Sequence, residues 1–109
     1  MDETQLQQTC EGIQRLYLAG SAGEQQHLSE REEVVQRARD LRAQLRVASD
    51  PETVSLLRRK CNQTIVLLSE IDCKLAATRA QMQELENDYR FYQCDVSFGV
   101  IDWLSLEGG

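Results

Sequence analysis

The feature that most constrains the fold is an unbroken heptad pattern between residues 51 and 93. Side chains compatible with a helical seam recur at alternating steps of three and four residues over six heptads. Such spacing places one stripe along one side of an α-helix and is typical of a coiled coil. The segment 51–94 is therefore predicted to be a long coiled-coil helix. Its seam consists of Val54, Leu57, Cys61, Thr64, Leu68, Ile71, Leu75, Thr78, Met82, Leu85, Tyr89 and Tyr92.

The first 50 residues predict further helices with a turn between them. Leu6, Cys10, Ile13 and Tyr17 are spaced by 4, 3 and 4 residues, which indicates a helix from about residue 2 to residue 19. The stretch 20–23 contains two glycines, which lower helix propensity and permit positive φ, so a turn is expected there. A second helix over 24–48 follows from the seam Val34, Ala38, Leu41, Leu45 and Ala48.

A sharper boundary falls just before Pro51. Asp50 can cap a helix through its carboxylate, and proline suits the first helical position because no amide hydrogen is needed there. The fold class predicted is all-α: a helical hairpin or a short three-helix region that continues into the long helix. A kinked rod is the alternative to the hairpin.

The length of the predicted heptad helix argues for a partner. A helix over 51–93 is roughly 65 Å long, whereas a helix over 24–48 is about 37 Å and covers only its first half. Another chain is then expected to bury the uncovered seam, and a hetero-oligomer is favoured over a homodimer. Apolar side chains around 65–68 spread beyond the seam, which predicts more than one neighbouring helix. The partner-binding residues predicted on this helix are Leu68, Ile71, Leu75, Met82, Leu85, Tyr89 and Tyr92.

The segment 95–109 differs from the rest because it is β-branched and aromatic, with Val96, Phe98 and Val100 alternating. It predicts an extended, strand-like docking element whose partner-binding side chains are Phe98, Val100, Trp103 and Leu106. The alternative is that these side chains cap the chain's own bundle.

Charge and hydropathy narrow the classes of partner and compartment. The chain carries 18 acids and 12 bases, for a net charge of -6, and no eight-residue stretch supplies the cluster of Lys and Arg that binding to phosphates needs. This balance argues against nucleic acid and against an anionic membrane surface. Without a long apolar run or the basic and apolar regions of a signal peptide, the chain is predicted to be cytoplasmic or nuclear and not secreted.

No pattern of reactive side chains predicts an enzyme. Cys10, Cys61, Cys73 and Cys94 form no CxxC pair, and His27 is the only histidine. Structural thiols in a reducing compartment are the favoured interpretation, with a redox or intermolecular disulfide or a metal site as alternatives. Motifs of hydrolases and phosphate-binding loops are absent, so no catalytic residue, cofactor, metal or small-molecule substrate is predicted.

The junction between the heptad helix and the apolar segment resembles a known arrangement. Phe98-Gly99-Val100-Ile101-Asp102-Trp103 follows a coiled coil much as the strand that opens an RWD domain does in outer-kinetochore subunits, and is most similar to the kinetochore-null scaffold family. The resemblance covers about the last 40 residues and lacks the rest of an RWD domain. It implies a chromosome-segregation scaffold whose coil pairs with another kinetochore protein.

Two functions are therefore expected from the sequence. The first is a non-enzymatic coiled-coil subunit that mediates assembly of a larger complex, such as a kinetochore or another microtubule-linked scaffold. The second is a self-associating adaptor that presents the C-terminal segment as a linear binding motif.

Overall fold

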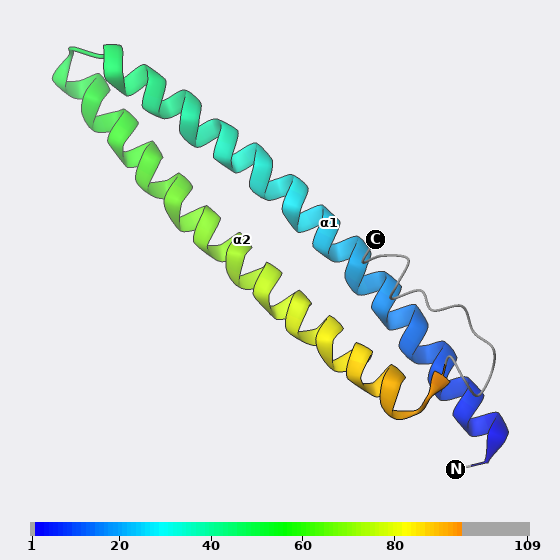
Figure 1. Ribbon diagram of the computed structural model, residues 1–109. Coiled ribbons are helices and arrows are strands. Elements are labelled where there is room, and N and C mark those ends of the chain that lie inside the picture. Colours follow the sequence, from blue (N-terminus) through cyan, green and yellow to red (C-terminus); the bar gives the residue numbers. More distant parts are fainter. Residues whose placement is uncertain (1, 95–109) are drawn as a thin grey trace. The chain divides into compact units, whose positions relative to one another are not determined.

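Two α-helices account for most of residues 2–94, which are the residues that the computed structural model describes. Helix α1 spans Glu3–Val47 and helix α2 spans Pro51–Phe91. Residues 48–50 connect them (Figure 1). No strand occurs within residues 2–94, so the predicted all-α class is confirmed for this range. The strand-like element predicted for 95–109 lies outside the described residues.

The start of α2 is built as the sequence predicts. Asp50 accepts hydrogen bonds through Oδ2 from the backbone N–H of Thr53 (3.0 Å) and from its hydroxyl (2.9 Å). The Asp50 carbonyl accepts the Val54 N–H at 2.9 Å, and Pro51 is the first helical residue. Asp50 is thus an N-cap, because its side chain satisfies one backbone donor, the Thr53 N–H, that has no partner within the helix. The predicted break at residues 49–50 is confirmed.

The predicted turn at 20–23 is wrong, and with it the short three-helix region, because α1 continues through these residues. The seam before and after the glycines has one phase. Positions 17, 20, 24, 27, 31 and 34 alternate by three and four residues, and all of them are buried or partly buried. Each glycine lowers helix stability by about 1 kcal/mol, which continuous packing along one seam offsets.

Packing divides the chain into two compact units, each of which combines a part of α1 with a part of α2. We call Glu24–Ala77 the hairpin unit, because it contains the connection at 48–50. The other, the terminal unit, includes the described residues 2–23 and 78–94. These units cut across the division into 1–50 and 51–94 because contacts between helices, rather than continuity along the chain, hold each unit together.

In the hairpin unit the two helices fold back on each other. Val34 packs with Ile71 and Leu75 in a buried cluster, against which Leu28 and Leu67 also pack. The guanidinium Nε of Arg31 donates to Asp72 Oδ1 at 2.8 Å across 41 residues of sequence. Contacts of this kind require antiparallel helices, so the hairpin is confirmed and the kinked rod is excluded.

The terminal unit is held by a second apolar cluster and by a close approach of the helices. Its buried residues are Cys10, Ile13, Tyr17, Tyr89 and Cys94. Gly20 lies against Met82, because a Cβ atom added to Gly20 would lie 2.9 Å from Met82 Cγ. A glycine in the seam here lets the helices approach more closely than a larger residue would.

Candidate partner-binding surfaces

The coiled-coil residues predicted to bind a partner line the inner side of α2 instead. Ile71, Leu75 and Tyr89 are only 2–4% exposed, and each is buried against α1 within its own unit. The argument that only another chain could cover this seam is wrong, because the unbroken α1 supplies the cover. The partly buried members of the predicted set pack against the same two clusters: Leu68, Met82, Leu85 and Tyr92.

The C-terminal part of the predicted binding set, Phe98, Val100, Trp103 and Leu106, lies outside the described residues. Its role as a docking element stays a prediction.

An apolar surface does face outward on α2 within the hairpin unit. Ile65 is 62% exposed and Val66 is 58% exposed. Val66 belongs to a stripe with 4-3-4-3 spacing that is entirely exposed and uncharged, opposite the inner seam of the same helix: Asn62, Val66, Ser69, Cys73 and Ala76. The spread of apolar residues around 65–68 predicts more than one neighbouring helix. Within residues 2–94, α1 is one such neighbour, and a second one stays a prediction.

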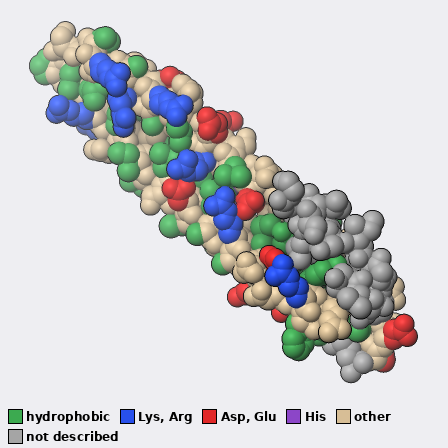
Figure 2. Space-filling model, in the orientation of Figure 1, with side chains coloured by type: hydrophobic (Ala, Val, Ile, Leu, Met, Phe, Trp, Pro, Cys, Tyr) green, Lys and Arg blue, Asp and Glu red, His purple; other side chains and the backbone are tan. Residues whose placement is uncertain are grey.

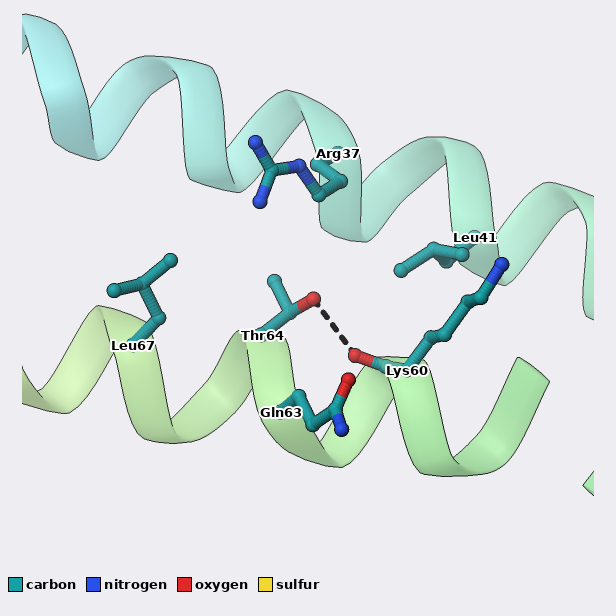
Figure 3. Close-up of a pocket in the computed structure, with 6 residues that line it drawn as sticks. All are labelled: Arg37, Leu41, Lys60, Gln63, Thr64 and Leu67. Atoms are coloured by element: carbon teal, nitrogen blue, oxygen red, sulfur yellow. Dashed lines mark hydrogen bonds between the residues drawn. The ribbon is translucent and has the colours of Figure 1, made fainter. Parts of the chain in front are cut away.

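A groove opens between the helices of the same unit (Figure 3). Its volume is about 410 Å³, and α1 lines it with Arg37 and Leu41. The hydroxyl of Thr64, which is buried on α2, donates to the Lys60 carbonyl oxygen at 2.8 Å, so this polar group is satisfied within its own helix. Leu41 and Thr64 are buried and Leu67 is partly buried, while two exposed cations, one from each helix, also line the groove. The lining residues from α2 are Lys60, Gln63, Thr64 and Leu67.

Cations concentrate at the hairpin end of this unit (Figure 2). Residues 37–60 contain seven bases and three acids, a net charge of 7 − 3 = +4, whereas the rest of the chain carries −6 − 4 = −10. Within residues 2–94, none of the seven makes an ion pair. This cluster is not apparent in the sequence, because it forms only where the hairpin brings together two short segments, 37–46 and 58–60. The seven bases are Arg37, Arg39, Arg42, Arg46, Arg58, Arg59 and Lys60.

The cysteines differ from the favoured interpretation. Cys10 and Cys94 form a disulfide with Cα atoms 5.6 Å apart, so the interpretation of these two as thiols is wrong. The spacing could not reveal the pair, because α2 ends at Phe91 and Cys94 lies beyond it. Gln93, with a φ of 51°, turns the chain back just before it. Cys61 and Cys73 are free thiols. The predicted reducing compartment loses the support of the cysteines, since disulfides persist mainly in oxidising compartments.

No cluster of three potential metal ligands occurs among residues 2–94. Neither described helix has a stretch both long and apolar enough to cross a bilayer. No protein-family model, curated protein or solved structure matches the chain.

Proposed function

We propose that the chain is a non-enzymatic helical-hairpin subunit that assembles with another protein through the outer face of α2. The exposure of Ile65 and Val66 is the observation that supports this proposal. The inner side of the same helix already packs on α1, so a cover for these two side chains comes from outside the hairpin unit. Full burial of one such side chain is worth roughly 1.5–3 kcal/mol, which gives an association through this face a real driving force.

The spacing of the outer stripe indicates that the partner contributes a helix. A stripe with alternating steps of three and four residues accepts the side chains of a facing helix between its own. Ser69, Cys73 and Ala76 are small, so a second backbone can approach closely. The complex proposed is a three-helix arrangement in which the hairpin supplies two helices.

Charge beside the stripe favours a different protein over a second copy. Glu70 directly follows Ser69, the central residue of the stripe. A two-fold pairing of identical faces centred on Ser69 brings the Glu70 carboxylates of both copies together, and like charges at such positions oppose association. A hetero-oligomer avoids this repulsion.

Two finer versions of the proposal differ in the complex that is formed. A role in a kinetochore or another microtubule-linked scaffold rests on the resemblance of residues 98–103. A self-associating adaptor that presents the C-terminal segment as a linear motif is the alternative. The mass of the purified chain in solution separates them. A stable homodimer supports the adaptor, and a chain that forms a defined complex only with a co-expressed partner supports the subunit.

Site-specific photocrosslinking tests the interface. A photoreactive amino acid replaces Val66 in one sample and Gln25, an exposed residue of α1, in a matched control. We expect a protein adduct from position 66 and none from position 25 in the cells that produce the protein. An adduct of twice the chain mass identifies self-association instead.

A second measurement uses substitutions on the full chain. The double variant Ile65→Asp with Val66→Asp is expected to abolish the complex and keep its helicity, because charge on a buried apolar face opposes association. The control variant, Gln25→Asp with Gln44→Asp, adds the same charge at other exposed positions of α1. An intact complex in the first variant contradicts the proposed interface.

A further inference from the structure

The rim of the groove between α1 and α2 carries two cations with no anion between them. Arg37 comes from α1 and Lys60 from α2, and Figure 3 shows both side chains beside the same opening. Residues that flank a coiled-coil seam usually pair with opposite charges across the helices. Figure 3 shows the Arg37 guanidinium and the Lys60 ammonium on opposite sides of Thr64, so the opening presents two separate positive charges. An anionic ligand that lies along the opening can pair with both of them.

The floor of the groove indicates what kind of anion fits. Leu41 and Leu67 line it, so a ligand that only carries charge leaves apolar surface unused. Two further apolar side chains are exposed at this end of the unit: Val47 is 84% exposed and Leu56 is 46% exposed. The surface therefore matches a ligand that combines anionic and apolar groups.

Extended polyanions fit this surface less well than a short peptide. A DNA duplex presents phosphates along its whole surface, and it has no apolar groups to place on the floor of a groove. The excess of positive charge is confined to residues 37–60, because the rest of the chain has a net charge of −10. The connection between the helices and the start of α2, residues 48–52, contain Asp50 and Glu52 and no base, so the tip of the hairpin offers no cation to an anionic membrane.

We infer that this groove binds a short acidic and apolar segment of a partner protein. Carboxylates of that segment pair with Arg37 and Lys60, and its apolar side chains lie over Leu41 and Leu67. Arg37 offers a planar guanidinium that can hold a carboxylate through two parallel hydrogen bonds. The groove is a different surface from the outer face of α2, so this inference stands independently of the proposed function.

Fluorescence anisotropy with the full chain tests it. The probe is a labelled peptide of about 12 residues in which Glu and Asp alternate with Leu, a length that spans a few helical turns. Its binding is compared with that of a DNA duplex and of phosphatidylserine vesicles, each at about 50 mM and about 200 mM salt. The critical variant is Arg37→Glu with Lys60→Glu, and Arg37→Gln with Lys60→Gln repeats the test without charge reversal. The matched control, Arg39→Glu with Arg46→Glu, changes the net charge equally at exposed positions that do not line the groove.

We expect the peptide to bind more tightly than the duplex or the vesicles at both salt concentrations. Both groove variants are expected to weaken peptide binding roughly tenfold or more, and the control by about threefold or less, because only the groove residues form direct ion pairs. Equal loss in groove and control variants overturns the inference, since binding then follows net charge alone. Tighter binding of the duplex or of the vesicles overturns it in favour of that ligand. No binding of the peptide overturns it as well.

Discussion

The disulfide between Cys10 and Cys94 is expected to be the largest single contribution to the stability of this chain. It joins residues separated by 84 positions and so closes a loop around nearly all of the described chain. A cross-link of this span removes loop entropy from the unfolded chain that corresponds to about 4.5 kcal/mol at 25 °C. For a chain of this size, that difference shifts the melting temperature by on the order of 20 °C.

Urea unfolding followed by circular dichroism at 222 nm measures this difference. The oxidised protein is compared with Cys10→Ala combined with Cys94→Ala, each with and without a reducing agent. We expect reduction to destabilise the natural chain by several kcal/mol and to leave the variant unchanged, which separates the cross-link from the small cavity that alanine leaves. Cys73→Ala is the control, because this exposed thiol has no disulfide and its loss changes stability by about 0.5 kcal/mol or less. A difference between oxidised and reduced natural protein below about 1 kcal/mol refutes the reasoning.

Two further predictions test the packing of α1 and the start of α2. Gly23→Ala is expected to stabilise the protein by roughly 0.5–1 kcal/mol in the same unfolding assay, because open space surrounds the added Cβ and alanine favours helix. Gly20→Ala is expected to lack this gain in stability because Met82 occupies the space that the added Cβ needs. Equal gains at both positions would contradict the close approach of the helices at Gly20. Asp50→Ala is expected to lower stability by about 1 kcal/mol through loss of the N-cap, whereas Asp50→Asn is expected to keep most of it; equal losses would contradict capping.

The sequence allowed the helical class and the boundary at Pro51 to be predicted because both depend on local signals. Asp50 and Pro51 act on the residues next to them, and a heptad stripe is visible along one chain. At Gly20 and Gly23 local propensity favours a turn, whereas the phase of the seam favours a helix. The distance from Tyr17 to Val34 fits the alternating steps without a gap. This phase corresponds to one continuous helix, and a continuous helix supplies the cover for Tyr89.

The surfaces could be predicted only in part, since they depend on which segments meet. The excess of apolar side chains around Ile65 is a feature of one helix and was visible in the sequence. The basic hairpin end joins Arg37 to Lys60, and no single stretch contains enough cations to indicate it. The bond from Cys10 to Cys94 likewise depends on the fold, because it requires the chain to turn back at Gln93.

The bond between Cys10 and Cys94 also decides how the chain transmits mechanical tension. A pull applied to the segments before Cys10 and after Cys94 passes through the two sulfur atoms, and neither α2 nor the part of α1 after Cys10 carries it. The oxidised chain then resists extension, because most of both helices lies outside the line of force. Once the bond is reduced, the same pull can peel the helices apart, and the 84 residues of separation release roughly 280 Å of contour length. In the proposed role as an assembly subunit, the redox state of this one bond therefore sets whether the chain is stiff or extensible.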